Sequence, residues 1–323
     1  MHFNVPYKTK QFFFVLIKLS IVVGAFYFIY SRIVENEKLQ FNDFISLLNE
    51  KDIFSLKNAI FLIVLSGFNW FFEILKWQYL VNAIKKISFK NALEQSLGGL
   101  TASLITPNRI GDYGAKAVYY TKAFRKKIVL LNLVGNIAQM TITSIFGIIG
   151  LFIFINRYKI EINYSNVTKI VVIILVLGLL IIFGLKQNRF KIKGFSFRRI
   201  LDFIETIPTK THLLNLVFSL SRYLIFSFQF YYLLTLFNVN ISYLEAMVTI
   251  TSMYFLASVI PAISIFDVVI KGSVAVFLFN YIEINAFSVL SVTTIMWFLN
   301  FVMPSVIGSY FVLNFKFPKT ETK

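Results

Sequence analysis

The chain has 323 residues, of which 57% are hydrophobic and only 15% are charged, and its formal net charge is +17. Soluble domains carry about 25% charged residues, so this composition excludes an ordinary soluble domain and predicts an all-α polytopic integral membrane protein. The apolar runs are continuous and lack the alternation of an outer-membrane barrel. There is no cysteine, which excludes disulfides, thiol chemistry and cysteine-ligated metal sites.

The excess of lysine and arginine lies in loops next to the apolar runs, where the positive-inside rule places such residues. We therefore expect these basic residues to contact membrane lipid, and we expect no nucleic-acid partner. The sequence contains no nucleotide-binding glycine loop, no cluster of metal ligands and no nucleophile–histidine arrangement. We expect no enzymatic activity, no cofactor and no bound metal.

A membrane-spanning helix needs about 20 largely apolar residues. Six such helices are predicted, at about residues 12–30, 59–81, 128–155, 169–185, 213–237 and 286–313. Two further apolar segments, at about 92–124 and 244–281, contain internal breaks. The most basic loop, at 186–211, is expected in the cytoplasm, and its residues 197–207 have an amphipathic pattern suited to the membrane surface.

The distribution of basic residues predicts the topology. The first broken segment is basic at both ends, at 82–91 and at 125–127, so it should enter and leave on the cytoplasmic side. The loops that flank the second, at 238–243 and 282–285, contain no lysine or arginine, so this segment should enter from outside. Both chain termini are then cytoplasmic. Each broken segment is either a re-entrant hairpin or a pair of spans.

The two halves of the chain resemble each other. A gapless shift matches three polar pairs: Ser103 with Ser258, Asp112 with Asp267, and Lys116 with Lys271. Each half, at about 12–155 and 169–313, contains two spans, a broken segment and a third span, and the odd number of crossings gives the halves opposite orientations. We therefore predict a single transmembrane domain, 1–323, built as an inverted repeat, as in many secondary transporters.

The first break places charged residues inside an apolar run. Because ionisable groups at membrane depth usually face a cavity or one another, we expect a binding site for an anionic substrate here. A half-helix beginning near Gly111 would present free N–H groups and a positive dipole end. Arg109 offers a planar fork of donors that suits phosphate or carboxylate. The predicted substrate-binding residues are Asn108, Arg109, Gly111, Asp112 and Lys116.

An alternative for the first break is purely structural, with Asp112 as the N-cap of the half-helix and Arg109 as its salt-bridge partner. The second break adds Asp267 and Lys271 to the predicted substrate-binding residues. Structural roles are assigned to the prolines at the breaks and to the matched serines: Pro107, Pro261, Ser103 and Ser258.

Three of the charged residues within the other spans are assigned a role. Glu73 and Lys76 are one helical turn apart, and we expect them to form a structural pair. Lys76 and Trp77 fit the cytoplasmic interface better than a substrate contact. Arg222 either contacts the substrate or extends to the cytoplasmic surface by snorkelling.

The run SLITPNRIGD, from Ser103 to Asp112, resembles the signature of the lysylphosphatidylglycerol synthase transmembrane region, also called the flippase-like domain family. The family pattern is roughly Pro-Gly-Arg-x-Gly-Glu; here Asn108 replaces the glycine and Asp112 replaces the glutamate. The family's second motif is a Pro/Gly-rich turn that leads to an acidic residue. Residues 261–267 resemble it, although 262–266 contain no glycine.

The resemblance implies movement of a lipid or lipid-linked molecule between leaflets. The soluble aminoacyl-transfer domain of the synthases is missing from this sequence, so we expect a stand-alone flippase-like protein without synthase activity. We expect it in a bacterial cytoplasmic (inner) membrane.

Three functions remain open. The first is a flippase or transporter for an anionic or polyprenyl-linked lipid, whose head group is held at the broken helices near the membrane midplane. The second is a non-transporting, lipid-binding partner of envelope-biosynthesis enzymes, for which the 186–211 loop would matter more than the breaks. The third is an ion-coupled carrier of a small soluble anion.

Overall fold

The computed structural model describes residues 55–104, 106, 109–160, 197–260 and 267–318, together with positions 20 and 23. Within these ranges the regular secondary structure is entirely helical. The predicted span at 169–185 lies outside the described residues, and so does the span at 12–30 apart from positions 20 and 23. So do residues 186–196 of the basic loop and three residues at the breaks, Pro107, Asn108 and Pro261.

Among the described residues, four helices are long and apolar enough to cross a membrane. Three are continuous: α3 (Leu56–Asn82), α6 (Lys122–Arg157) and α9 (Thr209–Leu236). The fourth is built from three consecutive pieces, α12 (Ala286–Trp297), the π-helix η3 (Phe298–Val302) and α13 (Met303–Asn314). These four correspond to the second, third, fifth and sixth predicted spans.

Helix α6 extends beyond the span predicted within it. The span was predicted to begin at about residue 128, whereas α6 begins at Lys122 and its first turns contain the basic run 125–127. No proline or glycine interrupts this run, and lysine and arginine are good helix formers. The helix therefore continues through the charged residues instead of ending at the edge of the apolar run.

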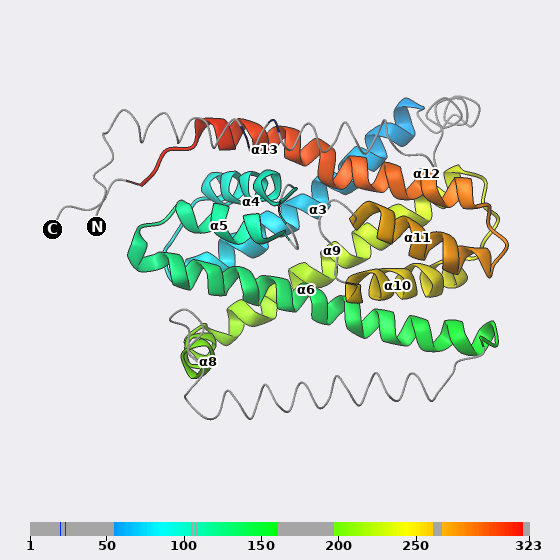
Figure 1. Ribbon diagram of the computed structural model, residues 1–323, viewed down its shortest axis with the longest axis horizontal. Helices are drawn as coiled ribbons and strands as arrows, with labels where there is room; N and C mark the ends of the chain where they lie inside the picture. The colour runs from blue at the N-terminus through cyan, green and yellow to red at the C-terminus, as the bar shows by residue number, and fades with distance from the viewer. Residues whose placement is uncertain are drawn as a thin grey trace.

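The two broken segments fold as helical hairpins. The first consists of α4 (Phe89–Leu104) and α5 (Ile110–Val118), and the second of α10 (Tyr243–Val259) and α11 (Asp267–Asn280). The longest of these four helices has 17 residues, which is short of the roughly 20 that a span needs. Figure 1 shows that the open end of the first hairpin lies where α6 begins, and that of the second where α6 ends.

Small residues let the hairpins approach the long helices closely. An added Cβ on Gly308 of α13 would overlap the Leu97 carbonyl oxygen of α4. On α6, a Cβ at Gly147 or Gly150 would overlap side chains of α10. Such close backbone contacts are a common means of helix association in membranes. They bring the second hairpin against the C-terminal half of α6, and the first hairpin against α13.

The basic residues gather at one end of the bundle. The end where α6 begins carries Lys85, Lys86, Lys90, Arg125, Lys126, Lys127 and Lys210, and helix α8 (Phe197–Glu205) packs there (Figure 1). Phe203 and Ile204 of α8 contact a buried cluster built around Trp77 and Leu131. The opposite end carries Arg157 and Glu245, which form an ion pair of 3.2 Å.

Candidate functional site

A cavity of about 540 Å³, lined by both charged and apolar side chains, lies between the facing ends of the two hairpins. Ligand pockets usually have volumes of about 300–1,000 Å³. Helices α3, α6, α9 and the π-helix η3 complete its walls, through residues such as Asn69, Gln139, Tyr223 and Phe301. Both broken segments therefore contribute to a single site.

Charged side chains from both halves of the chain line this cavity. Five are cationic and two are carboxylates, counted over the residues that the structure describes: Lys76, Arg109, Lys116, Arg222 and Lys271, with Glu73 and Asp112. Ser103 and Ser258 also line it. Ionisable groups within membrane segments usually mark substrate or ion pathways. The predicted substrate-binding residues whose side chains the structure describes thus lie together around the cavity, with one exception.

The exception is Gly111, which is not among the lining residues. An added Cβ there would overlap the Ala102 carbonyl oxygen of α4 and lie against the Thr106 hydroxyl. Gly111 therefore allows the first turn of α5 to pack tightly on the end of α4. Its predicted contact with the substrate stays a prediction.

Thr106 supplies the hydrogen bonds that shape this turn. Its hydroxyl accepts from the Gly111 backbone N–H at 2.8 Å and donates to the Ser103 carbonyl oxygen at 3.0 Å. The N-cap of α5 is Arg109, in a left-handed conformation with a φ of 56°. The alternative that Asp112 caps this half-helix is wrong, because Asp112 lies inside its first turn and makes other contacts.

Asp112 joins α5 to α6. Its Oδ2 accepts from Lys116 Nζ at 3.1 Å and from Asn132 Nδ2 at 2.8 Å, and Lys116 Nζ also donates to Asn132 Oδ1 at 2.9 Å. The ammonium group of Lys116 lies 4.5 Å from the centroid of the Trp77 ring. The triad of Asp112, Lys116 and Asn132 is therefore a closed polar unit at the cavity wall.

Glu73 joins α3 to α9. Its Oε2 lies 2.7 Å from Lys76 Nζ, as the spacing predicted, and also pairs with the guanidinium of Arg222. Arg222 Nε donates to the Asn69 carbonyl oxygen at 3.2 Å and to Asn69 Oδ1 at 3.1 Å. The snorkelling alternative for Arg222 is wrong, because its guanidinium points into the bundle.

The interface prediction for Lys76 and Trp77 is also wrong. Both are buried, with exposed fractions of 3% and 1%. Trp77 Nε1 donates to Gln95 Oε1 at 2.8 Å, so α3 is tied to α4 at this point. The face of α3 that carries these residues points into the bundle, where Glu73 compensates the Lys76 charge.

A chain of amide side chains, which we did not predict, crosses the bundle, and two of its members line the cavity. Asn69 Nδ2 donates to Asn300 Oδ1, and Asn300 Nδ2 donates to Gln229 Oε1, each at 2.9 Å. Gln229 Nε2 continues the chain to Ser66 Oγ at 2.8 Å. Every link joins different helices, so the network fixes the relative positions of α3, α9 and η3.

The π-helix at Asn300 has an identifiable partner. Pro304 has no backbone N–H, so it cannot donate to the carbonyl oxygen of Asn300, four residues earlier. That oxygen instead accepts from Trp70 Nε1 of α3 at 3.0 Å. π-Helical turns are often found at functional sites, and both Asn300 and Phe301 line the cavity.

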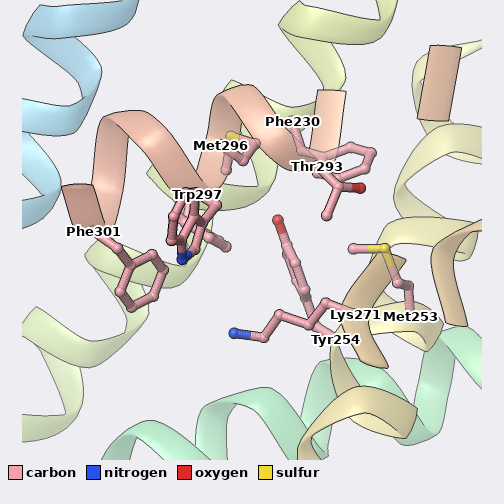
Figure 2. Close-up of a pocket in the computed structure, with 9 residues that line it drawn as sticks. Phe230, Met253, Tyr254, Lys271, Thr293, Met296, Trp297 and Phe301 are labelled. Atoms are coloured by element: carbon pink, nitrogen blue, oxygen red, sulfur yellow. The ribbon is translucent and has the colours of Figure 1, made fainter. Parts of the chain in front are cut away.

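The second hairpin contributes Lys271 and the wall around it. Figure 2 shows the Lys271 side chain extending from α11 toward Phe301, beside Tyr254 and Trp297. These residues also line a mostly apolar pocket of about 30 Å³ that adjoins the cavity. The Tyr254 hydroxyl is buried and has no hydrogen-bond partner among the described residues. Asp267 is the first residue of α11, and its side chain lies outside the described part.

The family of the chain follows from its sequence as a whole. Residues 15–308 match the lysylphosphatidylglycerol synthase TM region. The chain belongs to this family. Comparison with curated proteins and with solved structures finds no match. The family match and the long apolar helices together establish an integral membrane protein, and membership suggests a function related to membrane lipids.

Proposed function

We propose that this lysylphosphatidylglycerol synthase TM-region protein is a flippase or transporter that moves an anionic lipid or lipid-linked molecule between leaflets. The observation that carries the proposal is the cavity itself. Five cationic side chains and two carboxylates line it, among the residues described. Because cationic side chains outnumber carboxylates among the described lining residues, the cavity would attract an anionic head group.

The head group would be held by side chains of both hairpins. Arg109 offers a planar fork suited to phosphate oxygens, and Lys116 and Lys271 add positive charge from opposite sides of the break region. Glu73 and Asp112 each contact a cation already, so they would set the geometry of Lys76, Lys116 and Arg222. The hydrocarbon chains of the ligand would remain in the lipid phase.

The proposal includes an inverted repeat. The end of the bundle where α6 begins would face the cytoplasm, because it carries most of the basic residues described. The first hairpin would then be re-entrant from the cytoplasm and the second from outside. In secondary transporters such a pair of broken helices forms a binding site near the midplane, to which each side gains access in turn. We propose the bacterial cytoplasmic membrane as the location.

A transport assay in vesicles tests the proposal. The protein is reconstituted into liposomes with fluorescently labelled phosphatidylglycerol or phosphatidylcholine, and the label in the outer leaflet is destroyed chemically. Transport brings labelled lipid from the inner to the outer leaflet, where the reagent destroys the label, so the fluorescence falls further over time. We expect labelled phosphatidylglycerol to lose its fluorescence faster in vesicles that contain the protein than in protein-free vesicles. The rate should be roughly tenfold lower for Arg109→Gln, since a hydrogen bond to a charged group contributes about 1.5–3 kcal/mol.

Arg157→Gln is the matched control, because it removes the same charge from the end of α6, away from the cavity. It should transport as the wild type does. Equal accessibility of the label in protein-containing and protein-free vesicles, with either lipid, would contradict transport of these lipids. Specific lipid binding without such movement would favour the non-transporting partner of envelope-biosynthesis enzymes.

A further inference from the structure

Phe301 is contacted by cations from both hairpins. The guanidinium carbon of Arg109, at the start of α5, lies 4.6 Å from the centroid of the Phe301 ring. The ammonium nitrogen of Lys271, on α11, lies 5.4 Å from the same centroid. The ring itself belongs to neither hairpin, because it projects from the π-helix η3. One aromatic side chain thus lies beside cations from both broken segments.

A ring positions a cation differently from a carboxylate. The quadrupole of the ring attracts a cation without neutralising its charge. The two cations are thereby brought to one side chain at the cavity. An anion with several acceptor oxygens can contact both of them at once through charge-assisted hydrogen bonds.

The backbone conformation of Arg109 also points to a functional role for this residue. A left-handed conformation is unfavourable for a residue other than glycine, and Arg109 adopts it, with a φ of 56°. Such outliers persist where surrounding contacts enforce them, and they cluster at functional sites. Here the conformation coincides with the contact between the guanidinium and the Phe301 ring.

We propose that Phe301 is a positioning residue that holds Arg109 and Lys271 as a two-cation site for a phosphate group. This rests on the function proposed above and deepens it. The ligand class is a phosphate, from either a lipid head group or free inorganic phosphate. A phosphate bound at the two-cation site contacts both hairpins at once, so its binding joins the two halves of the molecule.

The test compares ring and non-ring substitutions at Phe301 in the purified full chain. Binding of inorganic phosphate and of dioctanoyl phosphatidylglycerol is measured by calorimetry in detergent, with dioctanoyl phosphatidylcholine as reference. Phe301→Leu keeps an apolar side chain but removes the quadrupole, and two lost contacts of about 0.7 kcal/mol each correspond to roughly tenfold weaker binding. Phe301→Trp keeps a ring, and we expect binding within about threefold of wild type.

Phe298→Leu is the matched control, since Phe298 lies in the same π-helix but is 43% exposed and does not line the cavity. It should bind as the wild type does. A purely structural role for Phe301 predicts the opposite order, with the larger tryptophan worse than leucine because of overpacking. That order, or an equal loss in Phe298→Leu, or no binding of either phosphate compound by the wild type, would overturn the proposal.

The ligands distinguish the source of the phosphate. Binding of phosphatidylglycerol alone assigns the site to a lipid head group, and binding of inorganic phosphate alone assigns it to the free ion. Either result supports the site if the Phe301 variants follow the expected order. If lipid transport is intact but the Phe301 substitutions leave phosphate binding unchanged, the two-cation site is overturned and the proposed transport function is not.

Discussion

The carboxylate of Glu73 on α3 pairs with the guanidinium of Arg222 on α9, and the same carboxylate oxygen contacts Lys76. One acidic group therefore compensates two cations and links two long helices. Arg222 has further partners, since it also donates to Asn69 and to Gln139 Oε1. Replacing Glu73 and replacing Arg222 should therefore change the stability of the protein by different amounts.

We expect Glu73→Gln to destabilise the protein more than Arg222→Gln does. The first change leaves Lys76 and Arg222 without their carboxylate, while the second leaves Glu73 paired with Lys76. Breaking a buried ion pair from one side costs about 3–5 kcal/mol, so Glu73→Gln should lose several kcal/mol and Arg222→Gln less. The unfolding transition in detergent measures both. Equal losses would contradict the shared role of Glu73.

Gly308 on α13 tests the close packing of the first hairpin. Alanine there would overlap the Leu97 carbonyl oxygen of α4, and such overpacking costs about 1–3 kcal/mol. We expect Gly308→Ala to lower the melting temperature clearly. Gly67→Ala on α3 is the control, because a Cβ at Gly67 meets nothing within 4 Å; it should leave stability unchanged or slightly higher. A neutral Gly308→Ala would show that α4 and α13 are further apart than described.

Thr106 tests the turn of the first hairpin. Thr106→Val keeps the shape of the side chain but removes the oxygen that accepts from the Gly111 N–H. Loss of such a capping hydroxyl costs about 1 kcal/mol. We expect lower stability and weaker ligand binding for Thr106→Val, because Arg109 lies in this turn, and near-normal behaviour for Thr106→Ser. If serine and valine behave alike, the hydroxyl does not shape the site.

The absence of cysteine makes the proposed orientation testable by labelling. Single cysteines are placed at Ser88, which precedes α4, and at Asn240 and Ile284, which flank the second hairpin. A membrane-impermeant thiol reagent added to intact cells should label positions 240 and 284 but not position 88. Labelling of all three from outside would contradict opposite entry of the two hairpins.

Much of the site followed from the cost of charge in an apolar environment. Arg109, Asp112, Lys116 and Lys271 stood out because a membrane segment rarely carries such residues without a reason. The structure places all four around one cavity. The breaks were equally visible, since proline, glycine and charge interrupt otherwise continuous apolar runs.

Other parts depend on which face of a helix points inward, and this the sequence did not reveal. α3 is apolar on most of its surface, so the burial of Lys76 and Trp77 could not be separated from a position at the interface. Asn69, Gln229 and Asn300 each resemble an ordinary polar residue until their helices are brought together. Phe301 was one of 38 phenylalanines, and only its place beside two cations distinguishes it.

The central claim is that the cavity between the hairpins holds an anionic lipid head group. The most direct measurement is the mass spectrometry of lipids that co-purify in mild detergent with wild-type protein, the Arg109→Ala/Asp112→Asn variant and the Arg157→Gln control. We predict that an anionic or polyprenyl-linked lipid is enriched over the bulk membrane in wild type and control and is lost from the double variant. Lipids that match the bulk membrane in all three samples would contradict the claim.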